Sequence, residues 1–349
     1  MPALPIFIKE FSSKKEYQND QPYDRFAKGI CQLKRYILTR LLSLIPVLLI
    51  VAIVVFFLIH LTPGDPASVI LGPQASPAEV EQLRDKLGLN LPLYQQFFDW
   101  FIGLFRGDLG WSISQNKPVL DAFLEHLGPT LSLSILAQAI SIILAIPIGI
   151  IAARKRGSKT DQFFMVLVML GMAVPSFLLG LLLMQLFGVK LKWFPVAGYE
   201  PLSAGVWNHL RYMIMPALAL GIIQTAVIAR MTRSSMLDVL SANYIKTAKA
   251  KGLKQRIVIY KHALRNASIA IITVVGESFG SLIAGAVVTE TVFNLPGIGQ
   301  LIMNSILRRD YAVIQGVILL ASVSYLLVNL IVDLLYGVID PRVRLNRKA

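Results

Sequence analysis

Six apolar runs divide this chain, and polar segments separate them. The runs are long enough to cross the hydrocarbon core of a bilayer as helices. Pro147 and Pro175 lie inside the second and third runs, where each is expected to kink a helix. The runs cover about 41–61, 130–152, 163–187, 212–228, 269–288 and 313–336. This pattern predicts an all-α polytopic membrane protein with six transmembrane helices.

The polar segment 62–129 is predicted to form a helical insertion outside the membrane. Residues 76–79 read Ser-Pro-Ala-Glu, which supplies an N-cap, a proline at the first helical position and an acidic first turn. The helix that starts there is expected to end at Gly88. A second amphipathic stretch over 93–105 is rich in Trp and Phe, so it is suited to lying at a membrane interface.

The most basic part of the chain is the segment 241–267, between the fourth and fifth runs. It contains eight Lys, Arg and His residues and no carboxylate. It predicts a helix over 244–251 that Gly252 ends, followed by a second helix over 255–264. One explanation is that the charge of this segment simply orients the protein in the membrane. A helix, a glycine stop and a second helix go beyond that need, and they favour a rigid lever.

Two carboxylates lie inside predicted spans, and a buried charge in a bilayer is a functional candidate. Asp333 is near the end of the sixth run, where pairing with an Arg is the simpler explanation. Glu277, in the fifth run, either faces a wet cavity or pairs with another subunit. Gly276, Gly280 and Ser281 give the same run a face of small residues, which permits helix packing or lines a pathway.

Charge predicts the sidedness of the protein. Only 15% of the residues are charged and 55% are hydrophobic, while the net charge is +14. If the N-terminus is inside, 25 of the 34 Lys and Arg lie in inner segments and 9 in outer ones. This asymmetry predicts that both termini are cytoplasmic. It accounts for the positive charge without nucleic acid, for which no aromatic-basic module is present.

Motifs for catalysis are missing from the sequence. It contains neither a phosphate-binding loop nor an H-E-x-x-H zinc motif, and its four histidines lack ligand spacing. The single cysteine, Cys31, cannot form a disulfide within the chain. We therefore expect no catalytic residue, no metal site and no bound cofactor in this chain.

Several motifs together resemble one family of transport proteins. The stretch KTAKAKGLKQRIVIYKHALRNA at 246–267 is similar to the coupling loop of bacterial ABC importer permeases, with Lys246, Thr247 and Ala248 at its E-A-A positions and Gly252 at its glycine. Lys246, Thr247 and Arg265 depart from the general coupling-loop pattern of these permeases, but they match the pattern typical of the dipeptide/oligopeptide/nickel permeases. Further matching stretches are 63–66, 107–110, 231–236, 289–293, 296–299, 308–311 and 340–342. The chain thus resembles the B-type permease of that family.

The resemblance implies a fold and a set of partners. The fold is that of a type I ABC importer permease in the bacterial inner membrane, and the cargo is di- or oligopeptides. The partners are a second homologous permease, two ABC ATPase subunits that bind ATP and Mg, an extracytoplasmic solute-binding protein and the lipid bilayer. The implied divisions are a cytoplasmic tail (1–36), transmembrane helix 1 (37–61), an extracytoplasmic segment (62–129), a permease core (130–336) and a cytoplasmic tail (337–349).

The resemblance also assigns roles to residues. The coupling loop would contact an ATPase, and the outer segments 62–129 and 289–312 would contact the binding protein. The coupling residues are Tyr244, Lys246, Thr247, Ala248, Lys251, Gly252, His262 and Arg265. The binding-protein contacts are Asp65, Asp108, Pro296, Arg308, Arg309 and Asp310.

Alternatives remain open at this point. The same architecture could import a nickel chelate, glutathione or another small solute. Two readings from other classes are a secondary transporter or channel that works alone, and a membrane scaffold or sensor subunit without flux. The first would transport solute without ATP or partners, and the second would bind an ATPase without transport.

Overall fold

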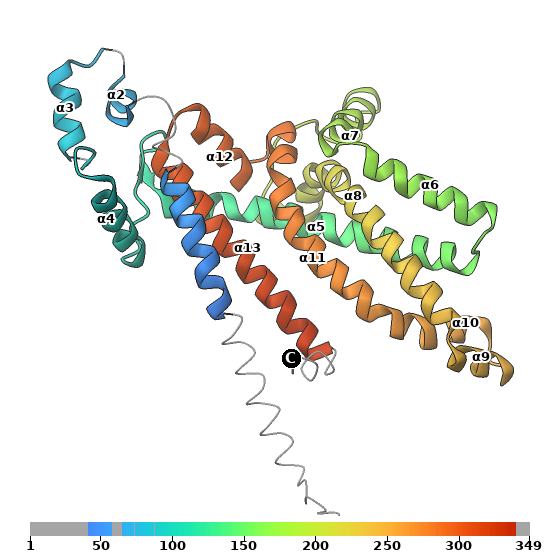
Figure 1. Ribbon diagram of the computed structural model, residues 1–349. Helices are drawn as coiled ribbons and strands as arrows, with labels where there is room; N and C mark the ends of the chain where they lie inside the picture. Colours follow the sequence, from blue (N-terminus) through green and yellow to red (C-terminus); the bar gives the residue numbers. More distant parts are fainter. Residues whose placement is uncertain (1–40, 58–64, 73, 87, 340–349) are drawn as a thin grey trace, which may run out of the picture.

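The protein is described from a computed structural model, which covers residues 41–57, 65–72, 74–86 and 88–339. Nearly all regular structure in this part of the chain is helical (Figure 1). The membrane-span elements are Leu41–Phe57, α5 (Val119–Arg154), α6 (Lys159–Ala173), α7 (Ser176–Leu183), the π-helix η1 (Met184–Lys190), α8 (Val206–Ser241), α11 (Leu264–Phe293) and α13 (Tyr311–Ile339). The others are α2 (Pro66–Leu71), α3 (Pro77–Lys86), α4 (Leu93–Phe105), β1 (Trp111–Ser112), β2 (Lys117–Pro118), the 3-10 turn η2 (Leu202–Ala204), α9 (Asn243–Ala250), α10 (Gln255–Ile257), the π-helix η3 (Val258–Ala263) and α12 (Ile298–Leu307).

The predicted apolar runs correspond to helices. Among the described residues, α5, α8, the continuous helix Gln255–Phe293 and α13 are long and apolar enough to cross a membrane. The helix Leu41–Phe57 is the described part of the first run. The third run is not one kinked helix as predicted, because α6 and the helix Ser176–Lys190 are bent by 100°. Pro175 lies at the bend, where its missing N–H and its ring prevent α6 from continuing.

The basic segment also differs from its prediction at one point. The helix expected over 255–264 does not stop before the fifth run. Instead α10, η3 and α11 form one helix from Gln255 to Phe293. No proline or glycine lies between Gln255 and Val275, so nothing in the sequence breaks the helix there.

Helices α5 and α8 form the centre of the bundle, and α11 packs against both. Glycines allow α5 and α8 to approach closely. A side chain at Gly149 would meet Thr232 at 2.5 Å, and one at Gly221 would meet the Ala137 carbonyl oxygen at 2.8 Å. Small residues at helix crossings are typical of membrane bundles, in which dispersion contacts replace the hydrophobic effect.

The insertion between the first two spans folds into three helices at one edge of the molecule (Figure 1). Helix α3 begins as predicted: Ser76 N donates to Glu79 Oε2 at 2.8 Å, and Glu79 N donates to Ser76 Oγ at 3.3 Å. This capping box satisfies two backbone N–H groups at the helix start. The hydrogen bonds from the Ser76 backbone and hydroxyl hold the pKa of the Glu79 carboxyl below its ordinary value.

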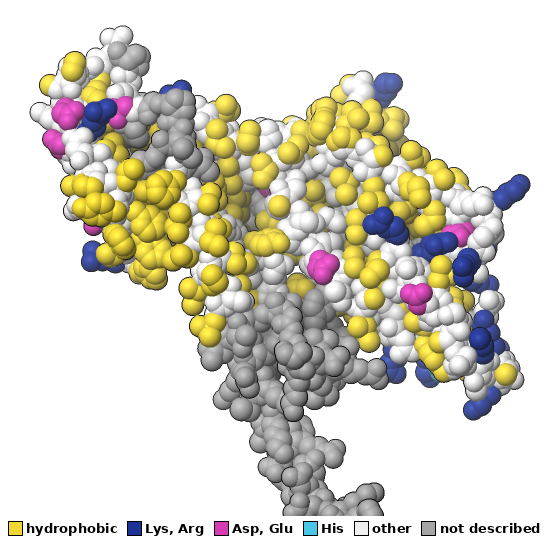
Figure 2. Space-filling model, in the orientation of Figure 1, with side chains coloured by type: hydrophobic (Ala, Val, Ile, Leu, Met, Phe, Trp, Pro, Cys, Tyr) yellow, Lys and Arg dark blue, Asp and Glu magenta, His cyan; other side chains and the backbone are white. Residues whose placement is uncertain are grey.

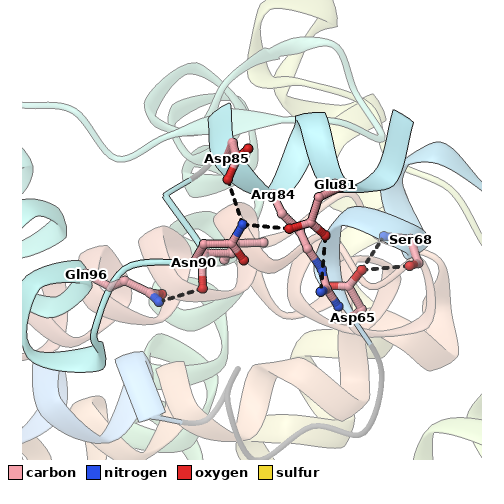
Figure 3. A network of polar contacts seen from close by, with 8 residues as sticks. Asp65, Ser68, Glu81, Arg84, Asp85, Asn90 and Gln96 are labelled. Carbon is pink, nitrogen blue, oxygen red and sulfur yellow. Dashed lines mark hydrogen bonds and ion pairs between the residues drawn. The ribbon is translucent and has the colours of Figure 1, made fainter. Parts of the chain in front are cut away.

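Polar contacts join α2, α3 and α4 into one unit (Figure 3). Asp65 caps α2 by accepting from Ser68 N at 3.0 Å, and Arg84 of α3 pairs with the same carboxylate at 3.1 Å. Asn90 Nδ2 donates to Glu81 at 2.9 Å and to Asp85 at 2.6 Å. Gln96 of α4 then donates to the carbonyls of Leu89 and Leu91. The start of α4 is therefore fixed relative to α3.

Candidate functional site

Helix α9 is a short lever between α8 and the long helix Gln255–Phe293. It ends in a Schellman motif, in which Gly252 N donates to the Lys249 carbonyl at 3.0 Å and Leu253 N to the Ala248 carbonyl at 3.4 Å. Gly252 has a φ of +74°, and no atom lies within 4 Å of the position that a Cβ would take. The glycine is therefore needed for its left-handed backbone and not for space.

The two faces of α9 differ in chemistry. Ile245 and Ala248 are buried in a cluster with Met236, Val258 and Ala263 of the same chain. The other candidate coupling residues of this segment are exposed: Tyr244, Lys246, Thr247, Lys251 and Gly252. Ala248 is therefore covered by its own chain, and its predicted role in coupling to an ATPase stays a prediction.

A hydrogen bond fastens α9 to the long helix. Asn266 Nδ2 donates to the Tyr244 hydroxyl at 2.7 Å and to the His262 carbonyl at 3.1 Å. His262 is half-buried beneath this contact, and Arg265 is exposed beside it. Together with the buried face of α9, this link couples the position of α9 to that of the helix Gln255–Phe293.

A second connection near the same end of the bundle joins α6 to α8. The Arg233 guanidinium donates to both oxygens of Asp161, at 2.7 and 2.8 Å. Gly157 N also donates to Asp161, at 3.0 Å. The Asp161 side chain is 5% exposed and that of Arg233 is 26% exposed, so this is a partly buried, bidentate pair with an additional hydrogen bond. It fixes α8, which leads directly into α9.

The pathway candidates of the fifth span lie on two different faces of α11. Gly276 and Gly280 are buried, and a side chain at Gly280 would meet Tyr325 of α13 at 2.7 Å. These two glycines therefore pack within the chain, which is the first of the two roles that the sequence left open for them, and their place in a pathway stays a prediction. Glu277 and Ser281, one turn apart, are exposed.

Glu277 has no hydrogen bond or ion pair with the described residues, whereas Ser281 accepts from Gln224 Nε2 of α8 at 2.6 Å. An unpaired carboxylate in the middle of an apolar span is too costly to face lipid. Glu277 and Ser281 are exposed on this face and Gln224 is half-buried, so the face requires water or a polar partner.

Sequence reasoning missed a buried network around Glu290, at the far end of α11. This side chain is fully buried and accepts from Thr130 Oγ1 at 2.5 Å, Gly299 N at 2.7 Å and Gln300 N at 3.3 Å. The carboxylate thereby caps the N-terminus of α12 and ties it to α5. A side chain at Gly297 would lie 2.2 Å from the same carboxylate. The signal for this site was a glutamate at the end of a span, followed closely by two glycines.

The candidate binding-protein contacts are divided between exposed and buried positions. Arg308 and Arg309, at the end of α12, are exposed, and so is Asp108. Asp65 is engaged by Ser68 and Arg84, and Pro296 is half-buried. Asp310 is 2% exposed and accepts from Ser112 Oγ at 2.8 Å and Ser114 N at 3.0 Å. Asp310 thus fastens the β1–β2 hairpin to the start of α13, and its contact with a binding protein stays a prediction.

Comparison with known proteins defines the class to which this bundle belongs. Residues 145–345 match the family described as the binding-protein-dependent transport system inner membrane component, and residues 33–134 match its N-terminal family. The chain belongs to this family of inner membrane permeases. Membership implies a solute-binding protein and ATPase subunits as partners. Within the described residues, no group of three or more His, Cys, Asp or Glu could hold a metal ion.

Three relatives of known or probable transport systems are similar to this chain along nearly their whole length. A probable peptide ABC transporter permease of Sinorhizobium fredii is 44% identical over 309 residues, covering 88% of this chain and 99% of the relative. The glutathione transport system permease of Escherichia coli K12 is also 44% identical, with 88% and 98% covered. The dipeptide transport system permease of Alkalihalophilus pseudofirmus is 43% identical over 329 residues, with 88% and 99% covered.

A solved structure confirms the predicted fold. The MetNI methionine ABC transporter, in inward-facing conformations, matches with a TM-score of 0.54 over 63% of this chain and 96% of that chain. The sequence identity is 15%, so this similarity concerns the fold alone.

Proposed function

We propose that this chain is a transmembrane subunit of an ABC importer for di- or oligopeptides. The observation that carries the proposal is the 44% identity to a probable peptide permease along 99% of that relative. In the proposed assembly, a second homologous permease pairs with this chain. Two ATPase subunits, which bind ATP and Mg, supply the energy, and an extracytoplasmic solute-binding protein delivers the peptide.

Helix α9 is the proposed contact with an ATPase. Its buried face holds it to the helix Gln255–Phe293, while its exposed face offers Lys246, Thr247 and Lys249 to a partner. Closure of the ATPase dimer would move α9 and the long helix together as a rigid body. The basic segment then lies on the cytoplasmic side, as do both termini.

Glu277 is the proposed polar contact of the translocation pathway. Every peptide with a free amino terminus carries an ammonium group, which a carboxylate in a wet cavity would attract. The alternative is that a cation of the second permease pairs with Glu277. Replacing Glu277 with Gln, which keeps the shape, should lower transport in the first case and weaken permease pairing in the second.

The tip of α12 is the proposed docking point for the binding protein. Arg308 and Arg309 have no ion pair among the described residues, and the neighbouring Leu307 is 78% exposed. Such a combination of cations and an apolar side chain suits an interface with an acidic partner. Asp310, at the start of α13, fastens the β1–β2 hairpin next to this tip.

The experiment that tests the function is transport by the complete reconstituted assembly. The two permeases, the ATPases and the binding protein are placed in proteoliposomes, and uptake of radiolabelled di- and tripeptides is measured with and without ATP. We expect ATP-dependent uptake that needs the binding protein. If nickel chelate or glutathione were taken up and no other peptide was, the proposed di- or oligopeptide cargo would be wrong. Uptake without ATP would overturn the importer mechanism.

A further inference from the structure

Helix α4 has an apolar surface that nothing in the described chain covers. None of its residues is buried, although most of its 13 residues are apolar. Gln95 and Asp99 lie on one exposed side. The α4 stripe, as we name the apolar side, consists of four large residues at helical spacing: Tyr94, Phe98, Ile102 and Phe105.

The exposure of the stripe is unusually high for such side chains. Tyr94 is 68% exposed, Phe98 58%, Ile102 47% and Phe105 80%. Figure 2 shows hydrophobic side chains gathered over α4, below the acidic side chains over α3. A patch of this kind on a segment outside the membrane would mark an interaction surface.

The depth of α4 follows from its contacts with the first span. Phe56 packs its ring against Phe97 at 5.2 Å and against Trp100 at 5.6 Å between centroids. Phe56 is five residues before Leu61, where the apolar run of the sequence ends. The contact therefore lies within the apolar run and close to its outer end. Interfacial helices bury their apolar face to a depth of about 5–10 Å.

The surface beside α4 is also apolar and exposed. The helix Leu41–Phe57 exposes Ile45 (58%), Ile50 (60%) and Val54 (54%) along its length. The aromatic contacts of Phe56 place α4 directly against this helix, as Figure 1 also shows. The apolar surface therefore continues from the transmembrane helix onto α4 at the same level of the membrane.

We propose that α4 is embedded in the outer leaflet of the bilayer and that its stripe contacts lipid acyl chains. Gln95 and Asp99 then face the headgroups and water. The helix braces the first span from the lipid side. Through Gln96 and the polar network of α3, it also fixes the acidic cap formed by α2 and α3 close to the membrane surface.

The test measures the surroundings of single positions on α4. In a Cys31→Ser background, nitroxide labels are attached to Phe98→Cys and Phe105→Cys on the stripe. Gln95→Cys and Asp99→Cys are matched controls on the polar side of the same helix. The complete transporter is reconstituted in nanodiscs, its assembly is verified by gel filtration, and collisions with oxygen and with a water-soluble nickel chelate are measured by electron paramagnetic resonance.

The expected result is an oxygen-to-nickel collision ratio that is several-fold higher at Phe98 and Phe105 than at the two controls. Equal ratios at all four positions would show that the stripe is in water. Low collision rates with both reagents on the stripe would show that a second protein covers it. Either result would overturn the proposal, and neither depends on which solute is transported.

Discussion

At the level of single residues, the Glu290 network places the strictest demands on the sequence. The carboxylate fills the space next to Gly297, and Val287 fills the space next to Gly299, at 2.3 Å from a would-be Cβ. Both glycines are needed because α11 side chains and backbone approach them closely, since neither glycine has a left-handed backbone. The network holds three elements, α5, α11 and α12, at one point.

We predict that Gly297→Ala destabilises the protein by about 1–3 kcal/mol, since the added methyl group must displace a buried, hydrogen-bonded carboxylate. Gly128→Ala is the control for the added methyl group, because nothing lies within 4 Å of the would-be Cβ of Gly128; Gly128 lies within α5, whereas Gly297 has an extended backbone just before α12. Thermal unfolding of the purified assembly measures the difference. Equal midpoints for both variants would show that the Glu290 pocket can relax.

The Asp161–Arg233 pair gives a second prediction at this scale. Asp161→Asn leaves the guanidinium of Arg233, whose side chain is 26% exposed, without its counter-charge, which should cost about 1–3 kcal/mol. Glu125→Gln serves as the comparison, because Glu125 pairs with Lys117 while 59% exposed, and such exposed pairs contribute about 0–1 kcal/mol. Denaturation of both variants in the same nanodiscs measures the two losses of stability, which can then be compared. A small effect at Asp161 would mean that water reaches Arg233.

At the level of elements, neighbouring residues of α9 lie on different faces of the helix. Thr247 is exposed and Ala248 is buried against the chain's own core. We predict that Thr247→Trp reduces the amount of ATPase that co-purifies with the permease and leaves the unfolding midpoint unchanged. Ala248→Trp should instead lower the midpoint, because the buried cluster has no room for an indole. If both variants lost the ATPase at full stability, the assigned orientation of α9 would be wrong.

The sequence predicted elements better than contacts. Apolar runs, the capping box at Ser76 and the stop at Gly252 are local signals, so the helices they define could be read directly. The 100° bend at Pro175 was underestimated, since proline shows where a helix is disturbed but not by how much. The burial of Asp310 had no local signal, and the glycines that follow Glu290 indicate a close approach without indicating which side chain the carboxylate binds. The partners of these two carboxylates, Ser112 and Thr130, are 198 and 160 residues away in the chain.

At the level of the whole molecule, the asymmetry of charge predicts how the protein lies in the membrane. Cysteines at Asn116 and Leu307 should react with a membrane-impermeant maleimide added to intact spheroplasts, in a Cys31→Ser background. A cysteine at Lys254 should react only after the membrane is permeabilised. The reverse pattern would place α9 outside and would exclude the proposed contact with a cytoplasmic ATPase.

The uninterrupted helix from Gln255 to Phe293 has a mechanical consequence. Its 39 residues span about 58 Å at 1.5 Å per residue, nearly twice the roughly 30 Å thickness of the hydrocarbon core. Near one end it carries α9, and near the other Glu290 anchors it to α5 and α12. If the anchored end acts as a pivot, a tilt of only about 5° displaces the opposite end by about 5 Å. A small rotation of the helix about its Glu290 anchor therefore corresponds to a large displacement of α9 on the other side of the membrane.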